Sequence, residues 1–189
     1  MTPLTPPNPF GEDARLRRLL ASRDERAAVQ RALAGVRGVT CLVQIMINIP
    51  GLPKSLERDF EAMRSAGDIL LDAIGSSPAV GVFLRNYAGP AGILAFAHPC
   101  ARDIKTAAMR VEDENEWGRA FDMDVITSTG QLSRTSLGGR ARSCALCGEP
   151  AKICARERRH PVTELREEIR RLLSLVPQTR RPSDNFSIS

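Results

Sequence analysis

The fold is decided by the stretch VTCLVQIMINI at residues 39–49, which forms most of the longest apolar run in the chain. This stretch is rich in Val, Ile and Leu and lies between Gly38 and the Pro50-Gly51 pair, a pattern typical of a buried β-strand. Gln44 interrupts the run, which is also too short to cross a bilayer. We therefore expect a soluble domain whose sheet contains this strand.

Downstream of the strand, helical and extended patterns alternate. Apolar residues at spacings of three and four predict two amphipathic helices, and short apolar runs bounded by Gly, Pro and Ser predict further strands. From residue 39 to residue 127 the order is β-α-β-β-α-β, so we predict an α+β fold with a ferredoxin-like sheet. The expected helices are residues 54–74 and 101–115, and the expected strands are residues 39–49, 79–87, 93–97, 121–127 and 131–134.

Further helices are expected on both sides of this unit. A short basic helix is predicted at residues 12–20 and a second at residues 23–34, opened by a capping box that joins Ser22 to Glu25. A last helix follows Pro161. The predicted organisation is a poorly ordered tail at residues 1–11, one domain at residues 12–176 with a Cys-rich segment at 138–160, and a second tail at residues 177–189.

Composition restricts the classes of partner. The chain has 189 residues and a formal net charge of +5, a mild excess that suits an anionic ligand or an acidic partner protein. Its few aromatic residues do not form the sheet signature of single-strand binders, so nucleic acid is not expected. No secretory pattern is visible, and the five cysteines, an odd number, favour free thiols or a metal site over disulfides. These features predict a cytoplasmic protein without a membrane partner.

Asp122 and Asp124 are the first candidates for chemistry. Alternate residues of a strand point to the same face, so the two side chains lie about 7 Å apart while Met123 and Val125 face the core. Such a pair holds Mg²⁺ together with phosphate oxygens, or one Asp accepts the proton of an incoming nucleophile. The alternative is a solvated strand face, or an ion pair with nearby Arg119.

Cys144, Cys147, Cys154 and His160 form a second candidate site, spaced C-x2-C-x6-C-x5-H. Three thiolates and an imidazole are a normal structural Zn²⁺ set, and the metal would order a segment with few apolar residues. The alternative is reduced cysteines packed under the last helix. Because the protein fills all four positions, the spacing favours a structural over a catalytic zinc ion.

Several segments are candidates for phosphate binding. Basic residues stand at the starts of three expected helices, where free backbone N–H groups add to their charge. A Gly-rich hairpin would let backbone N–H groups approach a ligand. The alternative is that the basic residues lie on solvated helix faces and that the glycines form a plain hairpin. The candidates are Arg23, Arg26, Lys54, Arg102 and Lys105, with Gly89 and Gly92 in the hairpin.

Six motifs follow one another along the chain. They are SRDER at Ser22–Arg26, PKS at Pro53–Ser55, GPAG at Gly89–Gly92, ARDIK at Ala101–Lys105, GRAFDMDV at Gly118–Val125 and CALCGEPAKICARERRH at Cys144–His160. In this order and spacing they span about residues 20–175. The chain thereby resembles the apo-citrate lyase phosphoribosyl-dephospho-CoA transferases, also called holo-acyl-carrier-protein synthases, the CitX family.

The resemblance implies a nucleotidyltransferase. Such enzymes attach the phosphoribosyl-dephospho-CoA part of 2'-(5''-triphosphoribosyl)-3'-dephospho-CoA to a serine of the acyl-carrier subunit of citrate lyase, and diphosphate leaves. Our physical interpretation gives the triphosphate to the five basic candidates and Mg²⁺ to Asp122 and Asp124. Arg119 would then stabilise charge at the transferring phosphorus, and zinc would be structural.

Two positions depart from the family's pattern. Asn115 and Glu116 stand where a His-Pro pair is common, and Ala91 stands where a Glu is common. These departures leave open the same chemistry on another carrier, such as that of malonate decarboxylase. A non-catalytic, zinc-stapled module that binds an anionic partner is the other alternative, although it gives Asp122 and Asp124 no role.

Overall fold

The computed structural model describes residues 9–98, 100–179 and 187–188, with only the backbone described at residues 9–12 and 187–188. The α-helices are α1 (Pro9–Ala34), α2 (Asp59–Ile74), α3 (Ala101–Glu114), α4 (Ala151–Glu157) and α5 (Val162–Ser174), and the 3-10 helices are η1 (Glu116–Ala120) and η2 (Thr135–Leu137). The strands are β1 (Cys41–Ile47), β2 (Val80–Asn86), β3 (Gly89–Phe96), β4 (Phe121–Thr127), β5 (Gly130–Leu132) and β6 (Ser187–Ile188).

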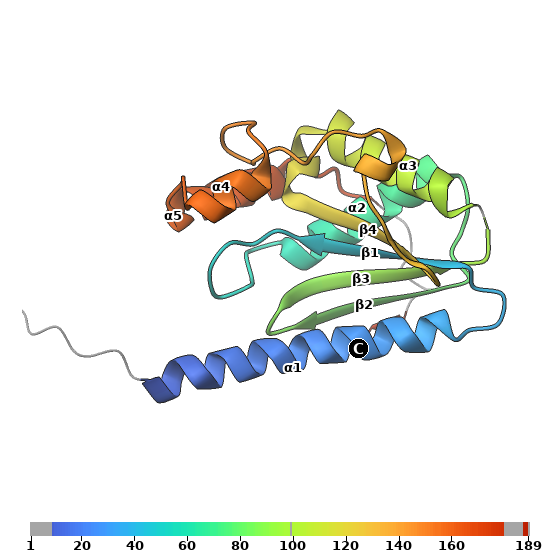
Figure 1. Ribbon diagram of the computed structural model, residues 1–189, viewed down its shortest axis with the longest axis horizontal. Helices are drawn as coiled ribbons and strands as arrows, with labels where there is room; N and C mark the ends of the chain where they lie inside the picture. Colours follow the sequence, from blue (N-terminus) through green and yellow to red (C-terminus); the bar gives the residue numbers. More distant parts are fainter. Residues whose placement is uncertain (1–8, 99, 180–186, 189) are drawn as a thin grey trace, which may run out of the picture.

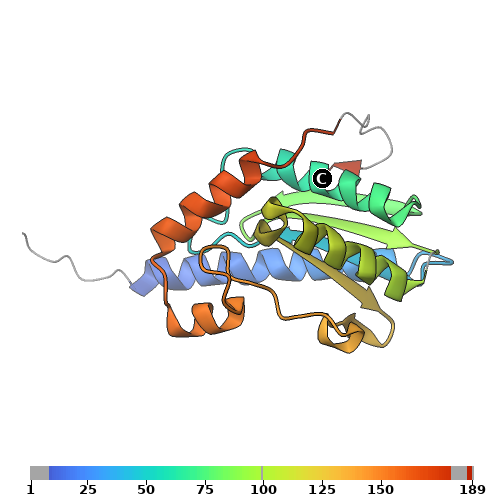
Figure 2. The same ribbon diagram turned by 90° about the horizontal axis from the view of Figure 1, so that it is seen from above.

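The elements form three layers around one sheet. The strand order is β5-β4-β1-β3-β2-β6. Helix α1 crosses one face of the sheet, and α2 and α3 cover the other (Figure 1). Seen from above, α2 and α3 lie side by side over the sheet, while α5 and α4 lie at one end (Figure 2). The predicted α+β class is therefore confirmed.

The alternation of side chains in β1 explains why both faces need a cover. Cys41, Val43 and Ile45 belong to a large core between the sheet and α2, α3 and α5. Leu42 points the other way, into a smaller core closed by Leu33 of α1. A central strand with apolar residues on both faces must be covered on both, which explains why apolar residues fill most of positions 39–49 instead of alternating with polar ones.

The chain order from β1 to β4 is β1-α2-β2-β3-α3-β4, as predicted from the hydrophobic pattern. The four strands lie in the order β4-β1-β3-β2, and neighbouring strands are antiparallel. Two short strands extend this unit. Strand β5 pairs antiparallel with β4, and β6 pairs parallel with β2.

The prediction of two N-terminal helices is wrong, because α1 is one helix from Pro9 to Ala34. No Gly or Pro separates the two expected segments, so the helix continues across the expected break. Ser22 and Glu25 lie inside the helix, where they bind a different partner. The Asn86 side-chain amide donates to the Ser22 carbonyl at 3.0 Å and to the Glu25 carboxylate at 2.7 Å, which ties α1 to the β2–β3 hairpin.

The β2–β3 hairpin is tighter than predicted. Its turn consists of Tyr87 and Ala88, and residues 89–92 of the loop expected at 88–92 form the first half of β3. Gly92 is buried against Phe83, whose ring lies 2.8 Å from where a Cβ at Gly92 would stand. Gly92 therefore serves the packing of the core and is not placed to contact a ligand.

Smaller differences concern the ends of elements. The helix predicted from residue 54 begins at Asp59, because residues 50–58 form a loop. The Cys-rich segment contains α4, which its spacing did not predict. Of the expected tails, residues 1–8, 180–186 and 189 lie outside the described residues, whereas residues 9–11 belong to α1 and residues 187–188 to β6. Within the described ranges, no helix combines the length and apolar character needed to cross a membrane.

Candidate active site and metal centre

The carboxylates of β4 lie on the face of the sheet that α1 crosses. Met123 and Val125 are fully buried on the opposite face, as predicted from the alternation, and Phe121 is buried with them. Asp122 and Asp124 are half-buried, and their register partners on β1 are Met46 and Gln44. The strand thus presents two acidic side chains beside one another on one surface.

Arg142 is the cation that contacts this pair. Its Nη2 atom donates a hydrogen bond of 2.6 Å to Asp122 Oδ1. Burial acts to raise the pKa of Asp122, but the hydrogen bond and charge of Arg142 outweigh it, and the net pKa is lowered. Burial raises the pKa of Asp124 to about 6, helped by the charge of Asp122 and a hydrogen bond between the two carboxyl groups. The two carboxyls therefore differ in proton affinity, as an acid–base pair requires.

Lys105 is fully buried, and this corrects its predicted place on an exposed phosphate-binding face. Its Nζ atom donates to the Met123 carbonyl at 2.8 Å, and the Met123 N–H donates to Glu112 at 2.7 Å. Strand β5 pairs only with residues 125–127 of β4 and leaves the Met123 N–H and carbonyl without a strand partner. Lys105 and Glu112 satisfy these two backbone groups instead. Lys105 contributes charge near Asp122 and Asp124, but it supports β4 and does not reach an exposed phosphate.

Arg23 and Arg26 of α1 and Lys54 of the loop at residues 50–58 lie close enough for the charge of Arg23 to act on the other two. Burial and the charge of Arg23 lower the pKa of Arg26, and burial together with the charges of Arg23 and Arg166 lowers the pKa of Lys54. Lys54 Nζ donates to the Ile49 carbonyl at 2.6 Å. Among the described residues, no carboxylate pairs with Arg23, Arg26 or Lys54. Three cations without an acidic partner are able to bind an anionic group.

The loop that carries Lys54 is fixed from two sides. Arg166 of α5 donates to the carbonyls of Pro50, Pro53 and Ser55 at 2.8–3.0 Å. On the other side, a Cβ at Gly89 would lie 2.8 Å from the Lys54 carbonyl, so only Gly permits this close approach. Gly89 thus positions the loop of Lys54, which corrects its predicted role as a direct ligand contact.

The cation cluster and the carboxylate pair lie on the same face and at the same end of the sheet. Helix α1 and β1 run in opposite directions (Figure 1), and the Gln30 side chain hydrogen-bonds to Gln44. Arg26 is one helical turn, about 5.4 Å, before Gln30 and on the same side of α1. This places Arg26 near the level of Met46, whose register partner is Asp122.

Two predicted site residues lie apart from this group. Arg102 is exposed on the first turn of α3, which follows the end of β3 at Phe96. Phe96 pairs with Cys41 at the start of β1, whereas Lys54 follows the other end of β1. Arg102 and the cation cluster are therefore at opposite ends of the sheet.

Arg119 is the second residue that lies apart. Its Nη1 atom donates to the Ala145 carbonyl at 2.9 Å, and its Nη2 atom lies 3.6–3.8 Å from Glu116 and Glu168. Arg142, and not Arg119, makes the ion pair with Asp122 that the sequence suggested as the alternative. The contacts of Arg119 join η1 to the Cys-rich segment.

The two positions that depart from the family's pattern have structural partners. Asn115 ends α3 and donates to the Val111 carbonyl at 2.9 Å, and Glu116 pairs with Arg171 at 2.7 Å. Ala91 is fully buried beside Met46, in the core between the sheet and α1. Neither position leaves a visible defect in the fold.

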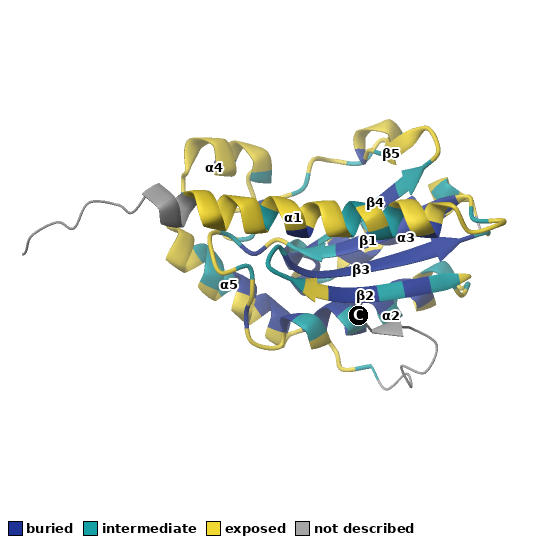
Figure 3. Cartoon of the chain, turned by 90° about the horizontal axis from the view of Figure 1, so that it is seen from below, coloured by how far each residue is buried: buried dark blue, intermediate teal, exposed yellow. Residues whose placement is uncertain are grey.

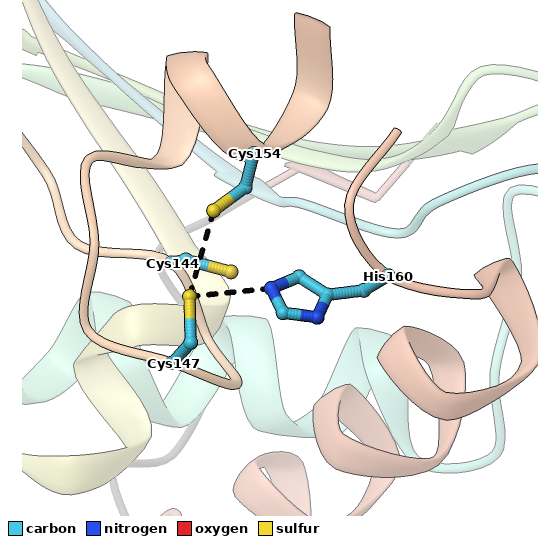
Figure 4. A group of neighbouring side chains, drawn as sticks. All are labelled: Cys144, Cys147, Cys154 and His160. Carbon is cyan, nitrogen blue, oxygen red and sulfur yellow. Dashed lines mark hydrogen bonds between the residues drawn. The ribbon is translucent and has the colours of Figure 1, made fainter. Parts of the chain in front are cut away.

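The four residues of the Cys-rich segment converge (Figure 4). One ligand atom from each of Cys144, Cys147, Cys154 and His160 lies within 4.8 Å of all the others. The Cys147 and Cys154 sulfurs are 3.5 Å apart, and His160 Nε2 is 3.2 Å from the Cys147 sulfur. In tetrahedral zinc, sulfur ligands lie about 3.8 Å from one another. The predicted grouping is confirmed, and its donor set fits zinc.

The thiols of this group differ in proton affinity. The Glu149 N–H lowers the pKa of Cys147 to about 7, assisted by His160. Burial and the neighbouring thiols raise the pKa of Cys154 to about 11. All five cysteines are free, as the odd number predicted.

Arg142, Glu112 and Arg166 were missed by the sequence analysis. Each acts on a segment far away in sequence: Arg142 on β4, Glu112 on the same strand, and Arg166 on the loop at residues 50–55. Nothing in the local pattern distinguishes them from solvated charges, so only the tertiary structure reveals them.

Comparison with known proteins gives a consistent answer. The CitX profile, described as apo-citrate lyase phosphoribosyl-dephospho-CoA transferase, matches residues 14–175. Proteins of that name from Shigella flexneri and Escherichia coli O139:H28 are each 36% identical over 162 residues, which cover 84% of this chain and 87% of theirs. One from Citrobacter koseri is 38% identical over 151 residues, covering 78% of this chain and 81% of its own. The chain therefore belongs to the apo-citrate lyase phosphoribosyl-dephospho-CoA transferase family.

Proposed function

We propose that this protein transfers the phosphoribosyl-dephospho-CoA group from 2'-(5''-triphosphoribosyl)-3'-dephospho-CoA to a serine of the apo acyl-carrier subunit of citrate lyase, with release of diphosphate. The observation that carries the proposal is the placement of an unpaired cation cluster and a carboxylate pair on one face, at one end of the sheet. The family name supports the donor class and the carrier. The five free cysteines suit a reducing compartment, and we place the reaction in the cytoplasm.

The chemistry assigns separate tasks to the two groups. Arg23, Arg26 and Lys54 bind the triphosphate of the donor and offset the charge that develops on the leaving diphosphate. The serine hydroxyl oxygen attacks the phosphorus nearest the ribose. A P–O bond forms to serine, and the bond from that phosphorus to the diphosphate oxygen breaks. Asp124 accepts the hydroxyl proton, and Arg142 keeps Asp122 ionised beside it.

Asp122 and Asp124 also fit a magnesium ion. The cation Arg142 occupies one oxygen of Asp122, and no described cation hydrogen-bonds to Asp124. Two carboxylates with phosphate oxygens and water are a common set for this ion. When bound, Mg²⁺ would neutralise charge on the triphosphate oxygens. Asp122 and Asp124 would hold it, and this is the alternative to the role of Asp124 as proton acceptor.

Zinc belongs to the same proposal as a structural ion. Cys144, Cys147, Cys154 and His160 supply four ligands, which leaves no open position for a substrate. We also propose a finer description of the fold. The chain order β1-α2-β2-β3-α3-β4 and the antiparallel order β4-β1-β3-β2 support a ferredoxin-like unit that β5 and β6 extend.

An intact-mass assay tests the reaction. The protein, Mg²⁺ and the triphosphoribosyl donor are incubated with apo citrate lyase carrier. We expect the carrier to gain the mass of the phosphoribosyl-dephospho-CoA group, and a carrier whose acceptor serine is replaced by alanine to gain nothing.

Two other outcomes would contradict the proposal in different ways. Transfer to the malonate decarboxylase carrier, with none to the citrate lyase carrier, would keep the chemistry and replace the partner. No transfer and no diphosphate release with either carrier would favour the non-catalytic, zinc-stapled module.

A further inference from the structure

Arg142 reaches the carboxylate pair from outside the sheet. It lies two residues before Cys144, in a segment without helix or strand, and its Nη2 atom makes the 2.6 Å bond to Asp122 of β4. A second carboxylate, Glu112 of α3, lies 4.0 Å from the same atom. No neighbour in sequence brings Arg142 to this place, so the tertiary structure of the Cys-rich segment must do so.

The backbone on both sides of Arg142 is closed into a short loop. The Arg142 carbonyl accepts the Ala151 N–H at 2.9 Å, and the Cys144 N–H donates to the Glu149 carbonyl at 2.6 Å. Ser143 and Pro150 form an antiparallel bridge between these two bonds. Cys144 and Cys147 lie within this loop, so the position of Arg142 depends on the geometry that these cysteines adopt.

Apolar packing does not account for the order of this segment. Between residues 138 and 160, Cys144 and Cys154 are the only buried residues, and α4 is largely exposed (Figure 3). Both buried side chains belong to the metal-ligand group. A segment whose interior consists of thiols has no hydrophobic core of its own, and a bound metal supplies the missing constraint.

The guanidinium of Arg142 is also not placed for best hydrogen bonding. Its Nε atom is buried without a hydrogen-bond partner, and it is the one such side-chain nitrogen or oxygen among the described residues. A buried, unsatisfied donor opposes folding. The contact of Arg142 with Asp122 therefore carries a cost in folding free energy, because Nε loses its hydrogen bonds to water. This cost points to a role for the contact other than stability.

We propose that Cys144, Cys147, Cys154 and His160 bind Zn²⁺ and that this zinc site makes Arg142 a positioning residue, which fixes the Asp122 carboxylate beside Asp124. The inference rests on the proposed function, because it gives the ion pair a role in transfer. Without the ion pair, Asp122 is free to change rotamer. The charge beside Asp124, which accepts the proton, is then no longer held in one position. Metal binding on the surface thus controls geometry at the carboxylate pair.

The first test separates positioning from substrate binding in the full-length protein. We expect Arg142→Ala to lower kcat about 100-fold, the scale of a misplaced catalytic group, with little change in KM for the triphosphate donor. Arg142→Lys should restore part of kcat, because a cation again reaches Asp122. Arg140→Ala is the matched control, since this exposed arginine belongs to the same segment and its described bond uses only the backbone carbonyl.

The second test asks whether zinc acts through Arg142. Wild-type protein should hold one zinc per chain by elemental analysis, and Cys147→Ser should lose it and show the kcat of Arg142→Ala. The double variant should be no worse than either single variant, because both changes break one chain of contacts. Circular dichroism confirms that each variant keeps its sheet.

The outcomes that overturn the inference are distinct from failure of the proposed function. A wild-type protein that transfers no group contradicts the proposed function, while its metal content still tests the zinc site. An active wild type without zinc, normal kcat in Arg142→Ala, or additive losses in the double variant would each refute the link between zinc and Arg142.

Discussion

At the scale of single residues, Asp124 combines its proposed role at the carboxylate pair with a cost to stability. Its pKa is raised from 3.8 to about 6, by burial first and by Asp122 second. The folded state therefore holds the proton more tightly than the unfolded state, so the cost of Asp124 is absent below about pH 4 and complete above about pH 6. This shift corresponds to at most about 3 kcal/mol, reduced by solvent because the side chain is only half-buried.

We expect Asp124→Asn to abolish transfer and to raise the free energy of unfolding at pH 8 by about 1 kcal/mol, with no gain at pH 4. Urea unfolding of both proteins at the two pH values, without added metal, measures this difference. A variant that is less stable at pH 8 would show that Asp124 is a structural carboxylate.

Lys54 supports a second prediction at this scale. Burial and Arg23 lower its pKa, so its charge is tolerated and not stabilising. We expect Lys54→Met to leave the melting temperature unchanged or higher and to raise KM for the triphosphate donor about 10- to 100-fold, since a charged hydrogen bond contributes about 1.5–3 kcal/mol.

Arg102→Ala is the matched control for Lys54→Met. Arg102 lies at the opposite end of the sheet and was a phosphate candidate on sequence alone. If the donor binds at the start of α3, Arg102→Ala should raise KM for the donor and Lys54→Met should leave it unchanged. That result would reject the cation cluster as the triphosphate site.

At the scale of elements, Gly89 connects the hairpin to the loop of Lys54. Its φ is +98°, and a Cβ would lie 2.8 Å from the Lys54 carbonyl. We expect Gly89→Ala to lose about 1–2 kcal/mol of stability from backbone strain and also to raise KM for the donor, because the loop must move.

Gly130 provides the control for Gly89. It has φ +119° at the start of β5, but nothing lies within 4 Å of the Cβ position. Gly130→Ala should therefore show strain alone, measured by thermal unfolding, with KM unchanged. Equal KM values for the two variants would show that Gly89 has no effect on donor binding through the loop of Lys54.

The same elements show what local sequence determines. Strands β1 and β4 and helix α3 were predicted within two residues at each end, because their apolar patterns match one period throughout. The continuous α1 was missed because the S-x-x-E pattern also occurs inside helices. Here Ser22 and Glu25 do not cap a helix but accept hydrogen bonds from Asn86, a residue far away in sequence. The start of β3 was missed because Gly89 and Gly92 are needed by contacts with Lys54 and Phe83, which lie in other segments.

At the scale of the whole molecule, the candidate site is assembled from segments that are far apart in sequence. The grouping of Cys144, Cys147, Cys154 and His160 and the pair Asp122 and Asp124 were predicted because each depends on local sequence: one is a spacing of possible ligands, the other an alternation in a strand. The cation cluster needed the tertiary structure, since Arg23 and Lys54 meet only when α1 folds back across the sheet. The sequence therefore identified candidate basic residues, and the fold shows that Arg102 lies away from the cation cluster.

The division between the sheet core and the Cys-rich segment leads to the last prediction. The large core contains residues of β1, β3, β4, α2, α3 and α5, whereas the Cys-rich segment adds only partly buried Ala145 to it. Local opening follows such differences in packing. We expect removal of zinc by a chelator to speed amide hydrogen exchange at residues 142–160 and to leave β1 and β3 protected, because the core does not depend on the ligands. Exchange measured by mass spectrometry on loaded and chelated protein tests this, and added Zn²⁺ should restore protection. Loss of protection throughout the sheet would instead make the metal a requirement of the whole fold, and unchanged exchange at residues 142–160 would mean that apolar packing alone orders the segment.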